Sequence, residues 1–539
     1  MLSLVRLRPD GAERTYYERA VASSREDYYA GRGEAHGEWT GSGARDLGLA
    51  GQLVDGDLTA ILGGRHPGTG DQLRRLPEAR EVTRTSIDPH TGDLVPRTVV
   101  HRPVSGFDLV FAAPKSVSLL YALATPEVQA QVGEAHRAAW RDALELLEDE
   151  AAVVRVGPGG VHRERAGLIA AGFQHRTSRE GDPHLHTHVI VANMGRAADG
   201  RMRALDGQPL ICDWRQAAGY LYQARLRHEL TGRLGLQWSE VTNGQADLTL
   251  FPTEVLEEFS TRRRQVLAHA AAAGATTPRG LEVAQRATRP DKHHLDWSDA
   301  VETWRARATE HGFRNRDLTD LRAPAPNPTH PHPRAPHTHP STGGTTAHPE
   351  STPGAAPGGG PCSGAHLHAP TLPTETTIRG SLLDVDGLTA TSQTFTQADI
   401  LKAIASAHPD GAPAHHLRTL AERIAADPEV IPTGDAILGR ARRLTTRDML
   451  TVERAGLASA VRGRGTETAR AGNEHLTKAL ERSEPPLSDE QAQVARMVAD
   501  HPDRVGCVQG AAGAGKTTAI AAGADALHRA GIPVTGAAP

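Results

Sequence analysis

Residues 182–193 read DPHLHTHVIVAN and place three histidines at alternate positions in front of an apolar run. In a β-strand, side chains two positions apart project from one face, so His184, His186 and His188 point together. Three neutral imidazoles on one face suit a divalent metal ion. The alternative is a solvent-facing, histidine-rich edge, but the strand continues as VIVAN into an apparent core, which favours a metal site. His175, upstream in GFQHRTSREGDP, is a candidate ligand from outside this strand.

The segments around this strand alternate between helical and strand-like patterns over residues 1–315. FDLVFAAP is strand-like, whereas PEVQAQVGEAHRAAWRDALELLEDE has the apolar spacing of an amphipathic helix. AERTYYERAVASSREDYYAG also has a helical pattern. This mixture predicts an α+β domain built around a sheet.

Length and composition limit the class of protein. A chain of 539 residues is too long for one ordinary core, so we expect three or four domains. The net charge of −4 excludes a globally basic protein, so any nucleic-acid surface must be local. Three scattered cysteines form neither a zinc spacing nor a disulfide framework, which fits a reducing cytosol. Without a signal peptide or an apolar stretch of ~18 residues, the sequence predicts a soluble cytoplasmic protein.

Composition also predicts the domain boundaries. Residues 322–377 are rich in Pro, Gly, Thr and His and cannot bury enough apolar surface to offset their ordering entropy, so we predict a disordered linker. The α+β domain then covers residues 1–315, and a small helical domain covers 378–484. Residues 485–539 read as strand RVGCVQG, a glycine-rich loop, a helix and the second strand start IPVTGAAP, which predicts the beginning of an α/β domain.

Four of the seven tyrosines, Tyr16, Tyr17, Tyr28 and Tyr29, lie within fourteen residues. Core aromatic residues would be spread more evenly, so phenols clustered near a metal site indicate nucleophiles. A tyrosine with an ordinary pKa of about 10 needs a metal ion or a base to attack at neutral pH. The alternative is a helix face whose paired aromatic rings serve packing alone.

Three blocks of sequence, in this order, resemble the signature motifs of the conjugative relaxases of the TrwC/TraI type, which are HUH endonucleases of the MobF class. They read YYERAVASSREDYYAGRGEAHGEWTGSGARDLGLAG, GFDLVFAAPKSVSLLYAL and FQHRTSREGDPHLHTHVIVANM. The resemblance covers about residues 1–310. It implies an α+β relaxase domain with a central antiparallel sheet and flanking helices.

The resemblance also implies roles for individual residues. The first tyrosine of each pair acts on DNA in this family, which corresponds to Tyr16 and Tyr28, with Tyr17 and Tyr29 beside them. The aspartate that orients a ligand histidine or assists deprotonation corresponds to Asp108. The implied metal ligands are His175, His186 and His188.

The implied reaction is a transesterification at one DNA phosphodiester. The metal, Mg²⁺ or Mn²⁺ with Zn²⁺ or Ni²⁺ as alternatives, polarises the scissile phosphate. Tyr16 attacks phosphorus, giving a 5′-phosphotyrosyl enzyme and a 3′-hydroxyl, and Tyr28 serves the second transfer. The implied partners are single-stranded or hairpin DNA of a plasmid transfer origin, relaxosome accessory proteins and a coupling protein.

Three features depart from the family pattern: the spacing of the tyrosine pairs, His184 and Ala112. The gap between the tyrosine pairs is longer, and at about 100° per residue Tyr17 shares a helix face with Tyr28 better than Tyr16 does. Either tyrosine of the first pair is therefore a candidate for the first step. His184 stands where a residue other than histidine is usual, so it competes with His175 as the third ligand.

Ala112 and Lys115 lie in the second block. Ala112 replaces a usual serine, which we interpret as a change in packing. Lys115 has two equally weighted interpretations, a contact to a DNA phosphate or a cap for a helix that begins near Ser116.

A second motif, GAAGAGKT at residues 510–517, fits G-x-x-x-x-G-K-[ST] between a predicted strand and a predicted helix. Loop amides and the helix N-terminus would hold the phosphates of ATP, with Lys516 at the β- and γ-phosphates and Thr517 at Mg²⁺. LSDEQAQVARMV upstream resembles the entry to the RecA-like, superfamily-1 helicase domain that follows the relaxase in this family. The predicted nucleotide-binding residues are Gly510, Gly513, Gly515, Lys516 and Thr517. Because no acidic Mg²⁺-binding segment follows, we expect no ATP-driven unwinding by this chain.

These motifs favour a conjugative relaxase fused to an incomplete helicase region. A rolling-circle replication initiator would use the same chemistry, and only the origin DNA distinguishes the two. A non-catalytic DNA-binding or loading protein with a decayed metal site is a third possibility, against which the intact histidine set argues.

Overall fold

The structure, a computed structural model, describes residues 1–8, 37–54, 56–87, 94–275, 277–288, 297–314, 318, 373–466, 470–511 and 513–536. Tyr16, Tyr17, Tyr28 and Tyr29 and the helix predicted around them lie outside the described residues, as does nearly all of the predicted linker. The chain divides into two compact units, Met1–Leu444 and Thr445–Pro539.

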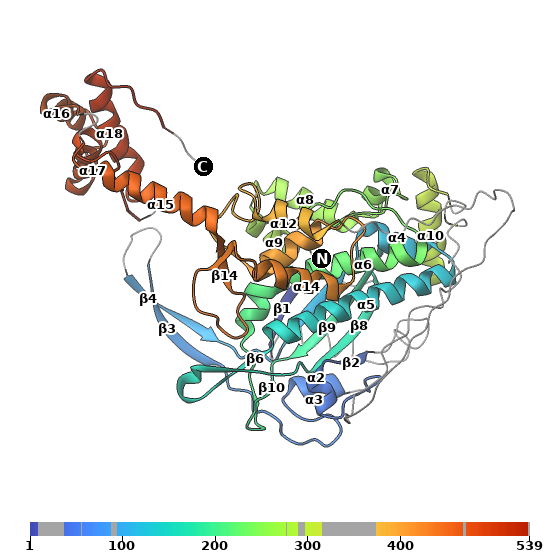
Figure 1. The fold of residues 1–539 in the computed structure, drawn as a ribbon. Coiled ribbons are helices and arrows are strands. Elements are labelled where there is room, and N and C mark those ends of the chain that lie inside the picture. The colour runs from blue at the N-terminus through green and yellow to red at the C-terminus, as the bar shows by residue number, and fades with distance from the viewer. Residues whose placement is uncertain are drawn as a thin grey trace, which may run out of the picture. The chain divides into compact units, whose positions relative to one another are not determined.

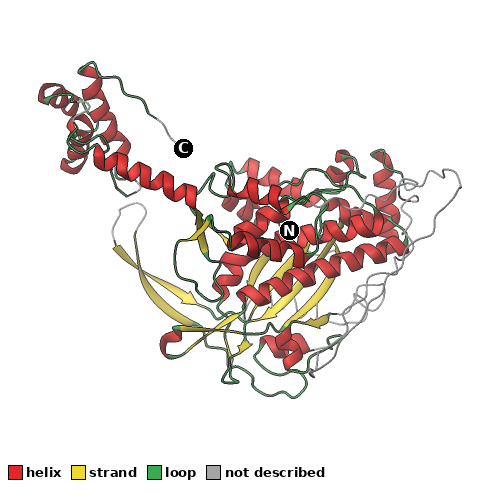
Figure 2. Ribbon diagram, viewed as in Figure 1, coloured by secondary structure: helices red, strands yellow, loops and turns green. Residues whose placement is uncertain are grey.

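A five-stranded sheet forms the centre of the first unit (Figures 1 and 2). Its order is β1-β5-β9-β8-β2, and every neighbouring pair is antiparallel. The predicted α+β domain with a central antiparallel sheet is confirmed, and the two predicted strands are β5 and β9. The strands are β1 (Leu2–Leu7), β2 (Glu38–Thr40), β5 (Gly106–Ala112), β8 (Ala170–Thr177) and β9 (Pro183–Ala192).

One face of the sheet is buried under helices. The alternate residues Leu185, Val189 and Val191 of β9 are fully buried there, in a core shared with the apolar stripes of the helices. Figure 1 shows α5 and α6 running across this face. The covering helices are α4 (Lys115–Leu123), α5 (Pro126–Ala151) and α6 (Arg215–Leu234).

The opposite face is apolar at one end and polar at the other. Near the end of β9, Ile190 and Ala192 belong to a second core with the short helices α2 (Ser42–Asp46) and α3 (Asp57–Leu62). Toward the start of β9 the same face carries the three histidines at 184, 186 and 188, because residues two apart share a face. The first half of β9 therefore alternates buried side chains with half-buried histidines, and its second half is buried on both faces.

Three two-stranded ribbons and several helices surround the sheet. In the longest ribbon, β3 with β4, Val99 and Val100 are about half exposed. The ribbons are β3 (Arg80–Ile87) with β4 (Leu94–His101), β6 (Val153–Val156) with β7 (His162–Arg165), and β10 (Gly195–Arg196) with β11 (Met202–Arg203). The helices are the π-helical turn Pro209–Trp214, α7 (Thr253–Glu258), α8 (Thr261–Ala272), α9 (Pro278–Ala287) and α10 (Trp297–Glu310).

Residues 373–444 also belong to the first unit, where they pack on α6. The guanidinium of Arg227 on α6 is buried and donates hydrogen bonds to the carbonyls of Ala405 (3.0 Å) and His408 (3.2 Å). Gly411 has a positive φ of 75°, and a Cβ there would lie 1.9 Å from the Ala224 carbonyl oxygen. The elements of this segment are α12 (Glu375–Leu383), α13 (Gln397–Ser406), α14 (Ala414–Ala425), β12 (Phe395–Thr396), β13 (Val430–Pro432) and β14 (Arg443–Thr446).

The compact units therefore divide the chain differently from the predicted domains. We predicted one helical domain over 378–484, but the division falls at residue 444, inside that range. The apolar side chains of α13 join the core beneath the central sheet, so the first part of the range has no separate core. The helix α12 begins at Glu375, within the last residues of the predicted linker.

The second unit is helical where it is described. It contains α15 (Arg447–Arg462), α16 (Asn473–Glu481), α17 (Asp489–Asp500) and α18 (Lys516–Arg529). The strands predicted from RVGCVQG and IPVTGAAP are wrong for the residues described, since no strand is assigned from residue 447 onward. A strand exists through hydrogen bonds to a neighbouring strand, and the described part of this unit offers none.

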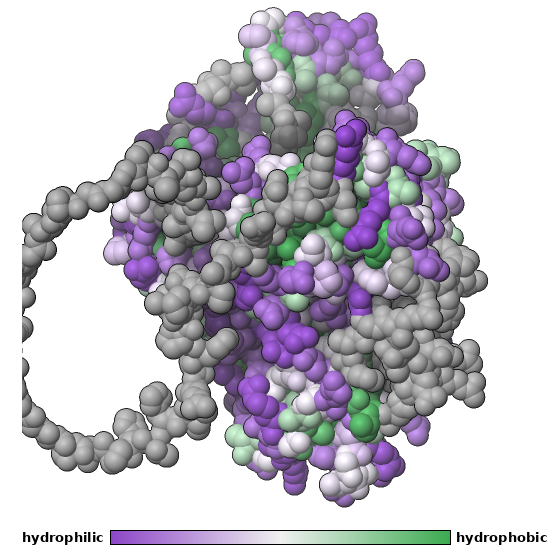
Figure 3. Space-filling view, turned by 90° about the vertical axis from the view of Figure 1, so that its right-hand side faces the viewer, coloured by the Kyte–Doolittle hydropathy of each residue, from purple (hydrophilic) through white to green (hydrophobic). Residues whose placement is uncertain are grey.

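Figure 3 shows a face on which hydrophilic side chains predominate and apolar ones appear in small patches. None of the described helices combines the length and the apolar character required to cross a bilayer.

Candidate active site

Three imidazole rings from adjacent strands meet at the polar end of the sheet. His175 on β8 is the direct cross-strand partner of His186 on β9, with ring centroids 5.3 Å apart and planes at 24°. The ring of His188 lies 5.2 Å from each of the other two. The three predicted ligands therefore form a triangle with nearly equal sides.

His184 lies beside this triangle. Its ring centroid is 4.6 Å from that of His186, one step closer to the start of β9. Its backbone carbonyl accepts a hydrogen bond from Nδ1 of His186 at 2.8 Å. The sequence left His184 and His175 as competing third ligands, and the arrangement of the rings favours His175.

Hydrogen bonds fix the tautomers of two of the rings. A carbonyl oxygen can only accept, so Nδ1 of His186 carries the proton and Nε2 presents a lone pair. Nδ1 of His188 lies 2.9 and 3.0 Å from the two carboxylate oxygens of Asp108 and donates to them in the same way. Burial lowers the pKa of His186 well below its usual value, which keeps this ring neutral, as a metal ligand must be.

Asp108 reaches the site from the neighbouring strand. In the register of β5 against β9, Asp108 lies opposite Ile190 and Val110 lies opposite His188. Asp108 is therefore diagonally across from the histidine that it contacts. Its side chain is almost completely buried. The structure brings Asp108 to the histidine set, as the family resemblance implied, and the contact can hold one ring in a fixed orientation.

The residues present fit a divalent cation. Three half-buried to buried imidazoles, two of them with defined tautomers, are a donor set that Mn²⁺, Zn²⁺, Ni²⁺ or Cu²⁺ accepts. Among the described residues, no three histidine, cysteine or carboxylate side chains already stand in a ready metal-binding arrangement. Binding an ion at this triangle therefore requires the rings to adjust.

A buried hydrogen-bonded chain supports β9 from its other face. His136 on α5 contacts the Thr187 hydroxyl through Nε2 and the Tyr222 hydroxyl through Nδ1, both at 2.8 Å. Burial lowers the pKa of His136 to about 3, so the ring is neutral. Sequence reasoning missed this chain, although a histidine inside the apolar stripe of a strong helix was a visible signal.

The turn between β8 and β9 is held by the helices that follow in the sequence. Asp182, which is buried, accepts a hydrogen bond from the Thr261 amide at 3.0 Å and pairs with Arg307 at 3.4 Å. The indole of Trp304 donates to the Gly181 carbonyl at 3.0 Å. These contacts join residues more than 70 positions apart, so no local pattern could have predicted them.

Lys115 ties the start of α4 to the start of β9. Its ammonium group donates to the Pro183 carbonyl at 2.8 Å. Burial lowers the pKa of Lys115 to about 8, although the negative charge of Asp182 acts to raise it. This contact differs from both interpretations of the sequence, a phosphate contact and a helix cap. Ser116 instead pairs with Asp247 through its amide (3.1 Å) and hydroxyl (2.6 Å).

The glycine-rich loop of the second unit leads directly into α18. Gly513 and Gly515 have φ of 80° and 71°, values that L side chains rarely adopt. The ammonium group of Lys516 reaches back over the loop and donates to the carbonyls of Gly510 and Ala511 at 2.7 Å each. Thr517 follows in the first turn of α18. The loop, the lysine and the helix N-terminus thus lie together, as the motif predicts.

Two family models match the chain. The model described as TrwC relaxase matches residues 10–311, and the model described as AAA domain matches residues 486–539. The first match includes four of the five strands of the central sheet, all except β1, together with the histidine triangle, and the second includes the glycine-rich loop.

Among curated proteins, the multifunctional conjugation protein TraI of Escherichia coli is 30% identical over 335 residues, which is 60% of this chain and 17% of TraI. The protein of the same name from strain K12 is 29% identical over the same lengths. The chain thus spans about a sixth of the length of these relatives.

Solved structures of the conjugative relaxase TrwC in complex with OriT DNA are also similar to this chain. The metal-bound structure is 30% identical and the copper-bound one 31%, each with a TM-score of 0.47. A complex with a 27-mer DNA that comprises the recognition hairpin and the cleavage site is 30% identical, with a TM-score of 0.45. Each match covers 58% of this chain and 100% of the solved chain.

Proposed function

This chain belongs to the TrwC relaxase family, the conjugative relaxases of the MobF class, and from that membership we propose that it nicks one strand of a plasmid transfer origin by tyrosine transesterification. The observation that carries the proposal is the triangle of His175, His186 and His188, with Asp108 hydrogen-bonded to one of its rings. A site of imidazoles beside an orienting carboxylate is suited to phosphate chemistry.

The three histidines of the triangle would hold the divalent cation, which when bound withdraws negative charge from the oxygens of the scissile phosphate. Mg²⁺ and Mn²⁺ are the ions we favour for a site completed by a substrate phosphate, with Zn²⁺ and Ni²⁺ as alternatives. Asp108 holds the proton on Nδ1 of His188 and so leaves the lone pair of Nε2 on that ring free to bind the cation. The peptide carbonyl of His184 does the same for His186.

Tyr16 supplies the nucleophile in this proposal. Its phenol loses a proton, its oxygen bonds to phosphorus, and the bond from phosphorus to the 3′ oxygen breaks. The departing oxygen takes up a proton and becomes a 3′-hydroxyl. One phosphodiester replaces another, so little free energy changes and the strand can be resealed. Tyr28 performs the second transfer, and Tyr17 and Tyr29 are the alternatives within each pair. All four tyrosines lie outside the described residues.

The remaining assignments follow from the same family membership. We assign nicking to residues 1–315 and a helicase region to residues 485–539, separated by the linker over 322–377 and the segment 378–484. In that region Gly510, Gly513, Gly515, Lys516 and Thr517 bind ATP with Mg²⁺. The DNA partner is a single-stranded or hairpin transfer origin, and the protein partners are relaxosome accessory proteins and a coupling protein.

The test is a covalent adduct. The full chain with Mn²⁺ is incubated with single-stranded oligonucleotides that tile the DNA flanking its gene, and the products are separated in SDS. We expect one oligonucleotide to yield a protein–DNA band that is resistant to SDS. The band should not form when EDTA is present during the incubation.

Matched variants identify the nucleophile. Tyr16→Phe should abolish the first adduct, Tyr28→Phe should leave it, and Tyr220→Phe on α6, a tyrosine remote from the pairs in sequence, is the control. An adduct that persists in the Tyr16→Phe, Tyr28→Phe double variant contradicts the assignment of the pairs. Tight hairpin binding without any adduct would instead favour a non-catalytic DNA-binding protein.

A further inference from the structure

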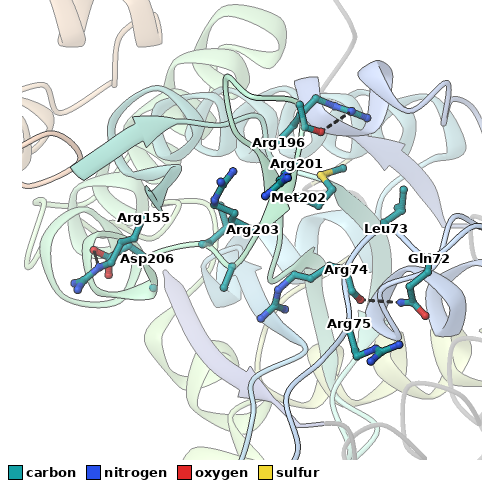
Figure 4. Close-up of a pocket in the computed structure, with 14 residues that line it drawn as sticks. Gln72, Leu73, Arg74, Arg75, Arg155, Arg196, Arg201, Met202, Arg203 and Asp206 are labelled. Atoms are coloured by element: carbon teal, nitrogen blue, oxygen red, sulfur yellow. Dashed lines mark hydrogen bonds and ion pairs between the residues drawn. The ribbon is translucent and has the colours of Figure 1, made fainter. Parts of the chain in front are cut away.

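Polar side chains of the first unit lie in two different settings. One is the cavity of about 870 Å³ in Figure 4, which several exposed arginines line. The other is the apolar core beneath the central sheet, where Thr187, His136 and Tyr222 are joined by hydrogen bonds and none is more than 1% exposed. We call these three residues the Thr187 network. Burying polar groups weakens a core unless all are satisfied, and a satisfied network holds its members in one arrangement.

The Thr187 network connects β9 to two helices. Nε2 of His136 on α5 lies 2.8 Å from the Thr187 hydroxyl, and Nδ1 of the same ring lies 2.8 Å from the hydroxyl of Tyr222 on α6. A neutral imidazole donates through one nitrogen and accepts through the other, and a hydroxyl can do either. Both nitrogens of His136 are therefore satisfied, and the connection from β9 to α6 is continuous.

Thr187 occupies a special place on β9. Between Pro183 and Ala192, all of which the structure describes, Thr187 is the one polar side chain on the face that meets the helices. Its neighbours on that face, Leu185 and Val189, are fully buried and apolar. Apolar contacts have no preferred direction, whereas a hydrogen bond has a preferred length and angle. Among the side chains of this face, Thr187 therefore defines the position of β9 against the helices most sharply.

The hydrogen bond of Thr187 acts in a direction that the sheet itself restrains weakly. The Thr187 backbone lies between Phe111 of β5 and Gln174 of β8, and the hydrogen bonds between strands run within the sheet. They fix the register of β9 but resist movement out of the sheet less well. Side chains stand roughly perpendicular to the sheet, so the bond to His136 holds the height and tilt of β9 at this residue.

The height and tilt of β9 matter because Thr187 lies between two predicted metal ligands. His186 and His188 point to the opposite face, so a rotation of the strand at Thr187 moves both rings together. Bonds from imidazole nitrogen to a metal such as Zn²⁺ are about 2.0–2.1 Å long, and a functional site tolerates displacements of only about 0.5 Å. A support behind the strand therefore affects how well the rings can hold a cation.

We propose that Thr187, held by His136 and Tyr222, is a positioning residue that sets the geometry of His186 and His188 for the cation. The inference rests on the metal site of the proposed function. Thr187 touches neither the cation nor DNA in this proposal, and it acts through the backbone of β9 alone.

Co²⁺ is a suitable probe, because its visible absorption reports the geometry of its ligands. Thr187→Val removes the hydroxyl and keeps the branched shape of the side chain. We expect the full chain with this change to bind Co²⁺ about tenfold more weakly, the lower end of the loss typical for outer contacts of a metal site. Its Co²⁺ absorption spectrum should also differ from that of the wild type. Thr187→Ser keeps the hydroxyl and should restore both the affinity and the spectrum.

Two further variants separate positioning from general stability. Ser105→Ala is the matched control, because Ser105 is also buried and its hydroxyl donates to the Leu7 carbonyl at 3.2 Å, beside the same sheet. This variant loses a buried hydrogen bond but should keep the wild-type Co²⁺ affinity and spectrum. Tyr222→Phe removes the far end of the network without changing β9, and it should weaken Co²⁺ binding by a smaller factor. It provides the test if Thr187→Val does not fold.

The outcomes distinguish this inference from the proposed function. Wild-type affinity and spectrum in Thr187→Val overturn the positioning role, and nicking stands if the wild type forms the tyrosyl adduct. An equal loss of Co²⁺ affinity in Ser105→Ala also overturns it, because destabilisation alone would then explain the result. A wild-type chain that forms no adduct, while its Co²⁺ site depends on Thr187 as expected, overturns nicking alone.

Discussion

At the residue scale, the orientation of the histidine triangle depends on Asp108. Asp108→Asn replaces an acceptor-only carboxylate by an amide that can donate, so Nδ1 of His188 is no longer required to carry the proton. Loss of such a supporting contact lowers metal affinity roughly 10- to 100-fold. Calorimetric titration of the full chain with Mn²⁺ measures this change. Asp46→Asn, an exposed carboxylate on α2, should bind Mn²⁺ like the wild type, and equal affinities for all three proteins would contradict the assignment.

His136 predicts a dependence of stability on pH. Burial lowers its pKa to about 3 from the ordinary histidine value of 6.5, so between these values the unfolded chain binds a proton that the folded chain does not. Its contribution is therefore complete above pH 6.5 and is lost as the pH falls toward 3. From about pH 7 to about pH 5, this one group removes about 2 kcal/mol from the free energy of unfolding.

His136→Gln isolates this effect, because glutamine can still hydrogen-bond to Thr187 and Tyr222 but does not titrate. Urea denaturation at the two pH values should show a smaller loss of stability in the variant than in the wild type. His475→Gln in the second unit is the control, and its pH dependence should match the wild type. Parallel curves for wild type and His136→Gln would show that this ring is not held neutral.

The sequence could predict part of the site at this scale. Alternation along 182–193 was enough to place His184, His186 and His188 on one face, because strand geometry is local. The choice of His175 over His184 depends on the register of β8 against β9, and register is set by interactions across strands. The contacts of Asp182 and His136 come from helices distant in sequence, so they had no local signal.

At the element scale, the docking of residues 373–444 on α6 depends on a close backbone approach at Gly411. Gly411→Ala places a Cβ 1.9 Å from the Ala224 carbonyl oxygen and forces a left-handed backbone on alanine. A left-handed residue alone costs roughly 1–2 kcal/mol, and the overlap adds to it, so we expect a loss of more than about 2 kcal/mol. Denaturant unfolding of the full chain measures it.

A second glycine provides the comparison for this prediction. Gly232 lies in the last turn of α6, and a Cβ there would meet nothing within 4 Å. Gly232→Ala should therefore stabilise the protein by roughly 0.5–1 kcal/mol through the higher helix propensity of alanine. If both variants unfold like the wild type, residues 373–444 do not pack on α6 in solution.

Elements with strong local patterns were predictable, whereas the structure of a short apolar run such as RVGCVQG was not. The strands β5 and β9 and the helix α5 correspond to segments with clear periodicity. RVGCVQG has the same strand-like composition, but the described part of its unit gives it no partner. Whether an apolar run becomes a strand depends on the strands beside it in space, and its own sequence does not specify them.

At the scale of the whole molecule, two compact units predict two separable activities. Lys516→Ala removes the ammonium group from the glycine-rich loop, and loss of a charged hydrogen bond should weaken ATP binding about tenfold or more. We expect the tyrosyl adduct to form at the wild-type rate, because the histidine triangle belongs to the other unit. Fluorescent ATP titration and the adduct assay measure the two effects.

Lys478→Ala is the matched control for this experiment. Lys478 is exposed on α16 of the same unit, where it pairs with Glu474, four residues earlier. The control should keep both activities. Slower adduct formation in Lys516→Ala but not in Lys478→Ala would show that nicking depends on the nucleotide loop.

Composition predicted a break in the middle of the chain but not which parts would pack together. The Pro- and Gly-rich range was visible in the sequence, whereas the attachment of α13 to α6 rests on buried contacts such as those of Arg227. Such contacts depend on complementary surfaces, which a composition profile does not contain.

The segments before residue 319 and after residue 372 both belong to the first unit, and the residues between them lie outside the described part of the chain. The two segments are held together by the buried carbonyl contacts of Arg227 and by the shared core, independently of the chain that connects them. Cleavage of the chain between residues 319 and 372 should therefore leave one particle in gel filtration, which separates into two bands only in SDS. The two pieces, expressed as separate polypeptides, should likewise reassemble into a complete first unit.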